Sequence, residues 1–418
     1  MKVSSIVGVN FGDEGKGRMV DYFAGLYDYV VRYQGGDNAG HTVKNAYGEF
    51  ALHLIPSGIF HENTINIMGP GMVVNLKSLD KEIESLRAGG IEVSPKNLKI
   101  SHRASLLLPY HVQQDQEEEK RLKDKKYGST KKGIAPAYGD KYMKKTIQLG
   151  ELYDLDKCKE HFDDLVAYKR EVFNYDYDFT GIWEDLVALR EKYLPYIVDV
   201  YDLFEEGQGK SFLLEAQLGA MRDVDYGIYP YTSSSSPLAA YAPLGCGYPK
   251  LKLDEVIGIV KAYGTCVGEG PFVGELTGEE GDRLRTLGGE YGAATGRPRR
   301  ISYFDCVASR YGVQLQGADK LALTKLDVLD SLEKIPMIVA YKKGDFETKS
   351  FPYTPYLKDF EPVYKEFPGW GCDLSKVRNY KDFPKEAKMY VEYIEEELRT
   401  PISYISVGPE RDALILRD

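Results

Sequence analysis

A glycine-rich turn near the start of the chain carries side chains that can bind a phosphate and move a proton. The turn reads Gly-Asp-Glu-Gly-Lys-Gly over residues 12–17 and follows an apolar run that begins at Ser4. Glycines let backbone N–H groups approach an anion, and a helix that starts just after the turn directs its positive end to the same point. Asp13 and Lys16 add a carboxylate and a cation. The turn indicates a phosphate site, with an ordinary strand-turn-helix corner as the alternative, because neither G-x-x-x-x-G-K-[ST] nor G-x-G-x-x-G is present.

A second turn of the same character follows the next apolar strand, which we expect at residues 29–33. It reads Arg-Tyr-Gln-Gly-Gly-Asp-Asn-Ala-Gly-His-Thr over residues 32–42. Parallel α/β sheets place their ligand loops beyond the carboxyl ends of the strands. The two turns are therefore expected to face one ligand.

Two later stretches gather positive charge. The first reads Gly-Ser-Thr-Lys-Lys-Gly from Gly128, directly after a charged run that is typical of a solvated helix face, and its small hydroxyls suit a phosphate. The second reads Gly-Ala-Ala-Thr-Gly-Arg-Pro-Arg-Arg from Gly292. Arginine forks beside glycine and threonine suit carboxylates and phosphates alike, and the alternative is a surface charge cluster.

A base-reading motif follows an apolar strand that begins at Leu321 and ends in Thr-Lys-Leu-Asp. A carboxylate such as Asp327 can accept hydrogen bonds from both N1–H and the 2-amino group of guanine, and adenine cannot offer that pair of donors. The stem of Lys325 can cover the face of the base. The four residues resemble the Asn-Lys-x-Asp guanine reader of GTPases.

Bulk composition bounds the class of protein. The chain has 418 residues, is 43% hydrophobic and carries a net charge of −10, which argues against a general binder of nucleic acid or membrane surfaces. Any phosphate site must then be a local basic pocket. Five scattered cysteines without a C-x-x-C pair suggest neither a disulfide framework nor a zinc site and fit a reducing cytosol. No signal peptide and no run of 18 apolar residues is expected.

The remaining patterns alternate between strands and helices. We expect helices at residues 76–88, 254–262 and 385–398, a helical tyrosine-rich section at 152–206, and strands at 50–54, 64–68, 212–215, 265–267 and 402–405. The order predicts an α/β fold. A turn-rich segment over residues 216–237 is long enough to be functional.

The two N-terminal turns together resemble the adenylosuccinate synthetase family. The likeness runs from Gly12 to Gly408, with the motifs in the family's order. It implies an α/β fold in which residues 1–418 form a single large domain on a central, mainly parallel, P-loop-related sheet, with a helical subregion at roughly 150–210. It also implies a cytoplasmic homodimer whose active sites are shared across the interface, with neither nucleic acid nor membrane as a partner.

The resemblance further implies a reaction. The family uses GTP to join L-aspartate to inosinate (IMP), giving adenylosuccinate, GDP and phosphate through a 6-phosphoryl intermediate, in the synthesis of AMP. Asp13 is then the general base that removes the N1 proton of inosinate, and with the carbonyl of Gly40 it binds Mg²⁺. His41 stabilises charge on the β-phosphate, Lys16 neutralises the transferring phosphoryl group, and Gln217 contacts the 6-position.

Carried over residue by residue, the resemblance gives three binding sets. The GTP set is Gly12, Gly15, Lys16, Gly17, Gly40, His41, Thr42, Arg299, Lys325, Asp327, Ser406 and Gly408. The inosinate set is Asp13, Asn38, Ser129, Thr130, Lys144, Gln217, Thr232 and Arg297, and the aspartate set is Thr295, Arg297 and Arg299. Lys141 matches a lysine that the family keeps near the active site.

Four positions depart from the family pattern. Asp37 stands where the family usually has histidine, Ala294 replaces a threonine, and Lys144 stands where an arginine of the partner subunit reaches the 5′-phosphate. Lysine keeps the charge but loses the bidentate fork. The segment Glu-Ala-Gln-Leu-Gly leaves open whether Gln217 or Leu218 takes the place of the family glutamine.

These departures keep other functions open. The same chemistry on another 6-oxopurine nucleotide, such as deoxyguanylate, is one alternative, although relatives that use deoxyguanylate can lack the aspartate at the position of Asp13. A non-catalytic nucleotide-binding regulator would have lost the base, the histidine or the arginine loop. A simple GTP hydrolase would not need an aspartate-binding loop.

Overall fold

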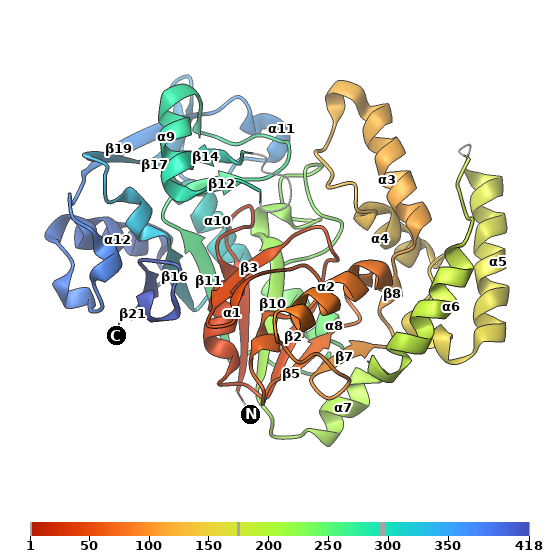
Figure 1. Cartoon of the computed structure of the whole chain (residues 1–418). Coiled ribbons are helices and arrows are strands. Elements are labelled where there is room, and N and C mark those ends of the chain that lie inside the picture. Colours follow the sequence, from red (N-terminus) through yellow and green to blue (C-terminus); the bar gives the residue numbers. More distant parts are fainter. Residues whose placement is uncertain (1, 174–175, 293–297, 418) are drawn as a thin grey trace.

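A ten-stranded sheet forms the centre of the computed structural model, which describes residues 2–173, 176–292 and 298–417 (Figure 1). In spatial order its strands are β21 (Leu414–Leu416), β20 (Ile402–Ser406), β16 (Lys320–Thr324), β11 (Glu255–Lys261), β1 (Val3–Gly8), β10 (Phe212–Gly219), β2 (Tyr29–Arg32), β5 (Ile65–Met68), β7 (Leu98–Ser101) and β9 (Ile197–Val198). Every pairing is parallel except that of β20 with β21. The predicted α/β fold on a mainly parallel sheet is confirmed.

The first strand lies in the middle of the sheet because it is buried on both faces. All six residues of β1 are buried, as expected for a central parallel strand. Ile6 pairs with Glu215 of β10 on one side and with Ile257 of β11 on the other. The turn that follows β1 therefore opens between the turns that follow its two neighbours.

The predicted helix at residues 254–262 is wrong, because this segment forms β11. Its sequence, Val-Ile-Gly-Ile-Val, is a short run rich in β-branched residues, which favour a strand, and it fills the space between β1 and β16. The other expected helices are confirmed at α2 (Leu76–Ala88) and α12 (Lys385–Leu398). The side chain of Asn75 caps α2 by accepting from the backbone N–H groups of Lys77 and Ser78.

Helices cover the sheet and form the two ends of the molecule. They are α1 (Lys16–Ala24), α2, α3 (Pro109–Leu122), α4 (Ile134–Met143), α5 (Leu155–Val172), α6 (Ile182–Tyr193), α7 (Val200–Glu206), α8 (Ala242–Cys246), α9 (Gly278–Gly288), α10 (Cys306–Gln316), α11 (Thr354–Leu357) and α12. In Figure 1, α3, α5 and α6 stand on one side of the sheet, and α9 and α12 lie on the other. The expected helical section is confirmed by α5, α6 and α7; the single-domain assignment stays a prediction.

Smaller strands complete the described chain. They are β3 (His41–Asn45) with β4 (Gly48–Leu52), β6 (Val73–Val74) with β8 (Ser105–Leu106), β14 (Arg300–Ser302) between β12 (Gly264–Cys266) and β13 (Glu275–Leu276), and β17 (Lys334–Lys343) with β15 (Phe304–Asp305), β18 (Phe346–Thr348) and β19 (Glu361–Pro368). The two largest apolar clusters come from different parts of the chain. One is built from residues between Val43 and Ile197, and the other almost wholly from residues between Val260 and Ile415.

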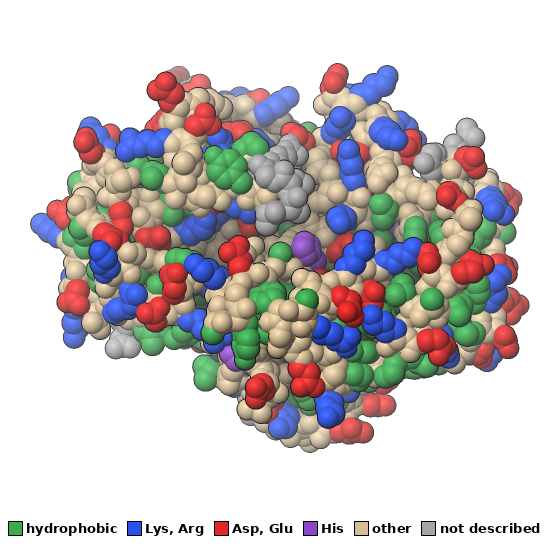
Figure 2. Space-filling view, in the orientation of Figure 1, with side chains coloured by type: hydrophobic (Ala, Val, Ile, Leu, Met, Phe, Trp, Pro, Cys, Tyr) green, Lys and Arg blue, Asp and Glu red, His purple; other side chains and the backbone are tan. Residues whose placement is uncertain are grey.

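Four of the five cysteines are buried free thiols, and the fifth, Cys372, is an exposed free thiol. In the part of the chain that the structure describes, no helix combines the length and the apolar character of a membrane span. Acidic and basic side chains are interspersed over the face shown in Figure 2, without a continuous basic surface. A phosphate site in this chain therefore depends on local groups.

Candidate active site

The candidate site lies at the carboxyl edge of the central sheet. The first turn follows β1, the second follows β2, Gln217 lies near the carboxyl end of β10, the base-reading motif follows β16, and Ser406 ends β20. These strands are close neighbours in the sheet, and only β11 separates β16 from β1. Segments far apart in sequence are thus brought to one edge, where the sequence predicted the two glycine-rich turns.

The two carboxylates of the first turn point in different directions. Glu14 is buried, where its Oε1 accepts from the backbone N–H groups of Asn10 at 3.1 Å and Gly12 at 2.8 Å, and its Oε2 lies 3.0 Å from Nζ of Lys16. Asp13 has a left-handed φ of +67° and a side chain that is 33% exposed. Glu14 therefore braces the turn, and Asp13 is the carboxylate available to a ligand.

Asp13 lies against Arg299, which belongs to the arginine-rich loop of residues 292–300. Its Oδ2 lies 2.5 Å from Nε of Arg299, whose Nη1 donates to Oε2 of Glu290 at 2.7 Å. Burial alone would lower the pKa of Arg299, but the carboxylates of Asp13 and Glu290 more than offset it and hold the pKa above its usual range. The loop residues Thr295 and Arg297, and the departure at Ala294, lie outside the described residues.

His41, at the end of the second turn, is oriented by Glu215, a buried residue of β10. Its Nδ1 lies 2.7 Å from Oε1 of Glu215. The hydroxyl of Ser57 donates to the same Oε1 and its backbone N–H donates to Oε2, both at 2.8 Å. Burial lowers the pKa of His41, which favours a neutral ring that donates from Nδ1 and leaves Nε2 for a ligand. A Cβ on Gly17 would come within 2.7 Å of Cβ of His41, so only glycine lets α1 begin this close to the ring.

Gln217 and Leu218 lie near the carboxyl end of β10, against the two glycine-rich turns. The side chain of Gln217 is buried against the second turn and donates from Nε2 to the carbonyls of Gly36 at 2.8 Å and Ala39 at 3.1 Å. Leu218 has a left-handed φ of +65° and lies against Gly12 of the first turn. Gln217 therefore places a buried amide against the second turn, and its place as the family glutamine stays a prediction.

Lys325 and Asp327 lie beyond β16 in a short 3₁₀ turn. Nζ of Lys325 donates to the carbonyl of Gly288 at 2.7 Å and to Oε1 of Glu290 at 2.8 Å. Burial raises the pKa of Asp327, although the positive charges of Lys325 and Arg18 oppose that rise. The hydroxyl of Thr324 donates to the carbonyl of Glu14 at 2.7 Å and so links the base-reading strand to the first turn.

Ser406 and Gly408 are held next to α1. The hydroxyl of Ser406 donates to the carbonyl of Gly408 at 3.1 Å. Arg18 on α1 donates to the hydroxyl of Ser406 and, from Nε, to the carbonyl of Pro409 at 3.2 Å. The C-terminal turn is thereby fixed beside the helix that begins at the first turn.

The other predicted residues lie around this core. Gly40, Thr42, Thr130 and Lys144 are exposed, and Asn38, Ser129 and Thr232 are half-buried. The hydroxyl of Ser129 donates to Oδ1 of Asp115 at 2.6 Å, so it is already hydrogen-bonded within the chain. Lys141 donates to the carbonyl of Pro70 at 2.7 Å, and burial lowers its pKa to about 8.

Asp37 is buried beside the start of α2. Its Oδ2 accepts from the hydroxyl of Ser78, in the first turn of α2, at 2.5 Å. A carboxylate is stabilised near the N-terminus of a helix. This departure from the family pattern therefore has a structural explanation in the start of α2.

Three residues that position the predicted site residues, Arg18, Glu215 and Glu290, are not among those predicted from the sequence. Glu215 had a signal, because it is one acid within the apolar run Phe-Leu-Leu-Glu-Ala of β10. Arg18 follows the glycine-rich turn directly and could have been flagged by that position. Glu290 has no pattern of its own, since its partners come from other parts of the chain.

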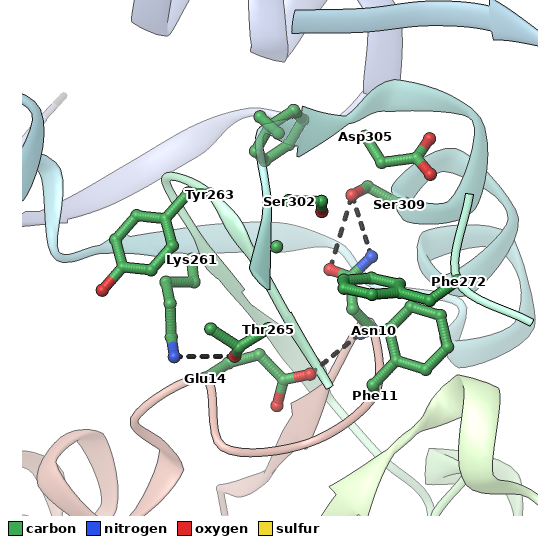
Figure 3. Close-up of a pocket in the computed structure, with 12 residues that line it drawn as sticks. Asn10, Phe11, Glu14, Lys261, Tyr263, Thr265, Phe272, Ser302, Asp305 and Ser309 are labelled. Atoms are coloured by element: carbon green, nitrogen blue, oxygen red, sulfur yellow. Dashed lines mark hydrogen bonds between the residues drawn. The ribbon is translucent and has the colours of Figure 1, made fainter. Parts of the chain in front are cut away.

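A small cavity lies behind the first turn, with Glu14, Lys261 and Thr265 among its lining residues (Figure 3). Its volume of about 10 Å³ is near the space that one water molecule needs. Nζ of Lys261 donates to the hydroxyl of Thr265 at 2.8 Å, the contact drawn between them in Figure 3. The cavity is far too small for a nucleotide.

The described residues contain no group of three or more His, Cys, Asp or Glu side chains arranged to hold a metal. Asp13 offers one partly exposed carboxylate, and Gly40, an exposed residue, offers its carbonyl. Mg²⁺ typically binds one or two carboxylates together with substrate phosphates and waters. The donor set thus fits Mg²⁺ that arrives with a nucleotide.

Comparison with known proteins gives a consistent result. A family model described as adenylosuccinate synthetase matches residues 5–415. The protein named adenylosuccinate synthetase from Caldanaerobacter subterraneus subsp. tengcongensis is 44% identical over 426 residues, covering 100% of this chain and 99% of its own. Adenylosuccinate synthetase 1 of Methanosarcina acetivorans is 41% identical over 427 residues and both chains are fully covered.

Solved structures agree with the sequence comparison. The fully ligated adenylosuccinate synthetase of Plasmodium falciparum superposes with a TM-score of 0.94 at 36% identity over 100% of both chains. The succinoaminodeoxyadenylate synthetase of cyanophage S-2L, solved with dGMP and dATP, has a TM-score of 0.61 at 19% identity, covering 99% of this chain and 95% of its own, and shares the fold alone. The chain therefore belongs to the adenylosuccinate synthetase family, the ligases that use GTP to join L-aspartate to inosinate.

Proposed function

We propose that this chain makes adenylosuccinate in two steps, through a 6-phosphoryl inosinate intermediate, with Asp13 as the general base. The observation that carries the proposal is the contact between Asp13 and Arg299, 2.5 Å apart. It brings the proposed base of the first step together with the loop proposed to bind the carboxylates of aspartate. Both reacting partners of the second step, the purine C6 and the aspartate amine, are therefore directed to one place.

The proposed chemistry needs one base and one activated oxygen. Asp13 takes the N1 proton of inosinate while O6 attacks the γ-phosphorus of GTP, and GDP leaves. The hydroxypurine oxygen is a poor leaving group, and phosphorylation makes it a good one. The aspartate amine then attacks C6, phosphate departs with O6, and the amine loses a proton. Before the first step, the contact between Asp13 and Arg299 must break so that the Asp13 carboxylate can accept the N1 proton of inosinate.

The proposal gives His41, Lys16 and Gln217 supporting roles. Nε2 of His41, with Nδ1 held by Glu215, is directed to the β-phosphate, where negative charge develops as GDP departs. Lys16 lies at the start of α1 and neutralises the transferring phosphoryl group. Gln217 has a buried Oε1 without a hydrogen-bond partner among the described residues, which suits a contact to the 6-position of the purine.

Mg²⁺ is part of the proposal as a partner of GTP. Asp13 and the carbonyl of Gly40 would hold it, and when bound it neutralises phosphate charge. Gly12, Gly15, Gly17 and Thr42 are proposed to surround the phosphates. Lys325, Asp327, Ser406 and Gly408 are proposed to surround the guanine.

The acceptor and aspartate sites are proposed from the same family pattern. Asn38, Ser129, Thr130 and Thr232 are proposed to contact inosinate, and Thr295, Arg297 and Arg299 the carboxylates of L-aspartate. Lys144 is exposed at the end of α4, in keeping with a proposed role at the 5′-phosphate in a partner subunit. We propose accordingly that the chain acts as a homodimer, in the cytoplasm.

The test is a product assay with purified protein, GTP, Mg²⁺ and L-aspartate. Inosinate, deoxyinosinate, guanylate and deoxyguanylate are offered separately, and the products are identified by mass. We expect adenylosuccinate, with inosinate as the preferred acceptor. A protein that makes no adenylosuccinate from inosinate contradicts the proposal.

A second measurement isolates the first step. GTP carrying ¹⁸O in the β–γ bridge is incubated with inosinate and without L-aspartate, and the position of the label is followed. Reversible phosphoryl transfer to O6 moves the label to the non-bridging positions of the β-phosphate. No movement of label in a protein that completes the full reaction would exclude the intermediate.

A further inference from the structure

Glu290, a buried residue that is not among the predicted site residues, is hydrogen-bonded to three segments around the candidate site. Glu290 follows α9 and is fully buried. Its Oε1 accepts from Nζ of Lys261 at 3.0 Å, from the hydroxyl of Tyr263 at 2.5 Å and from Nζ of Lys325 at 2.8 Å. Its Oε2 accepts from Nη1 of Arg299 at 2.7 Å. One carboxylate therefore meets three cations from three different segments.

The link to Arg299 fixes the base of the arginine loop. The backbone N–H of Arg299 donates to the carbonyl of Glu290 at 3.0 Å, and Nε of Arg285 donates to the carbonyl of Arg299 at 2.9 Å. Tyr291 and Pro298 form an isolated β-bridge one step further along. The guanidinium of Arg299 is thus shared between Glu290 on one side and Asp13 on the other.

The link to Lys325 fixes the base-reading motif. Lys325 has a left-handed φ of +58°, and its ammonium group bonds only to Glu290 and the carbonyl of Gly288 among the contacts the structure describes. Fixing both ends of a lysine holds its aliphatic stem in one place, which is what a stem that covers a base requires. The position of Lys325 therefore depends on the same carboxylate as that of Arg299.

We propose that Glu290 is a positioning residue that couples the guanine site to the aspartate site by sharing one buried charge between Lys325 and Arg299. The inference deepens the proposed function and relies on its assignment of Arg299 to aspartate and Lys325 to guanine. When a ligand carboxylate takes up the charge of Arg299, Glu290 holds Lys325 more strongly and the lysine stem lies more firmly over the base. L-Aspartate should therefore tighten the binding of a guanine nucleotide, and the nucleotide should tighten the binding of aspartate by the same factor.

The first test substitutes Glu290→Gln, which keeps the shape and removes the charge. We expect the KM values for GTP and for L-aspartate each to rise about tenfold, while the KM for inosinate changes less than twofold. A side chain that only supported the fold would change all three constants together or lower the thermal stability alone. A change confined to one of the two substrates would contradict the coupling.

Glu275→Gln is the matched control. Glu275 pairs with the neighbouring arginine, since its Oε1 accepts from Nε of Arg300 at 2.8 Å and its Oε2 from Nη2 at 2.5 Å. Its carboxylate has no described bond to Lys325 or Arg299. The control therefore removes an acid of the same chemistry beside the same loop, and it should leave both KM values within twofold of the wild type.

A binding measurement separates this inference from the proposed function, because it needs no turnover. The Kd of GDP is measured by calorimetry with and without saturating L-aspartate. We expect aspartate to tighten GDP binding at least threefold in the wild type and in Glu275→Gln, and to have no effect in Glu290→Gln. Equal Kd values in the wild type overturn the coupling, whether or not adenylosuccinate is made.

Should Glu290→Gln not fold, Glu290→Asp is measured in the same way. The shorter side chain keeps the charge but cannot reach all four donors. We expect the effect of aspartate on GDP binding to fall below that of the wild type. A fully retained effect would contradict the role of this carboxylate.

Discussion

The two acids of the first turn show how burial decides the role of a residue. Asp13 and Glu14 are adjacent and similar in chemistry, but Glu14 is occupied by two backbone N–H groups and Lys16, whereas Asp13 is partly exposed beside Arg299. The sequence places both acids in the turn, and the family resemblance assigns the role of general base to Asp13 alone. In the structure the side chain of Asp13, at a left-handed φ, is partly exposed, whereas that of Glu14 is buried.

This difference leads to the first prediction. Asp13→Asn keeps the size of the side chain but cannot accept the N1 proton, so kcat should fall by roughly 10³, within the range for loss of a general base. Steady-state kinetics measure kcat, and calorimetry checks that GDP binding stays within about threefold. A variant that retains more than about a tenth of kcat would show that another group is the base.

Lys141 provides a prediction about pH. Burial lowers its pKa to about 8, whereas in the unfolded chain it is near 10.5. Between these two pH values the unfolded state therefore binds more protons than the folded state, so the free energy of unfolding rises as pH rises from about 8 to 10.5. Below pH 8 Lys141 is protonated in both states, and the full cost of burying its charge lowers the stability. Because Lys141 is not fully buried, the free energy of unfolding should change by at most about 3 kcal/mol over this pH interval.

The comparison variant is Lys141→Met, which removes the titrating group. We subtract the melting temperature of the wild type from that of the variant at each pH. This difference should be a few degrees larger at pH 7.5 than at pH 9.5, because only the wild type gains stability between the two pH values. Circular dichroism at the two pH values measures the difference. A difference independent of pH would mean that Lys141 keeps its ordinary pKa.

At the scale of elements, a buried charge network joins three helices beside the site. Asp140 of α4 accepts from Nζ of Lys169 on α5 at 2.6 Å, and its other oxygen lies 2.9 Å from Nε2 of His111 on α3. All three side chains are almost fully buried. This network fixes α4, the helix that carries Lys141 and ends at Lys144.

We expect Asp140→Asn to destabilise the protein by about 3–5 kcal/mol, because it leaves the charge of Lys169 buried without a counter-ion. Urea or thermal denaturation measures the loss. The control is Asp163→Asn, which breaks the exposed pair with Lys159 on α5 and should cost less than about 1 kcal/mol. Equal losses in the two variants would contradict this account of α4.

The elements also show what the sequence could and could not predict. Strongly periodic helices such as α2 and α12 were predicted to the residue, and the glycine-rich turns were placed at strand ends correctly. The short apolar run of β11 is wrongly predicted as a helix, because periodicity does not separate a buried strand from a buried helix of that length. Glu290 was missed because its partners converge only in three dimensions.

At the scale of the whole molecule, the proposed dimer assigns Lys144 to the active site of the partner. The residue is exposed at the end of α4, and its left-handed φ of +63° ends that helix. If Lys144 acts across the interface, Lys144→Ala should strongly raise the KM for inosinate, and Asp13→Asn should be nearly inactive. Each homodimer then has two damaged sites.

Mixing the two variants distinguishes a shared site from a self-contained one. In a mixed dimer, one site combines the intact Asp13 of the first chain with the intact Lys144 of the second, while the other site lacks both. Random exchange makes about half of the dimers mixed, so the mixture should recover about one quarter of wild-type activity at low inosinate. Activity no greater than the sum of the two separate variants would place Lys144 in its own subunit's site, because no intact site could then form by exchange.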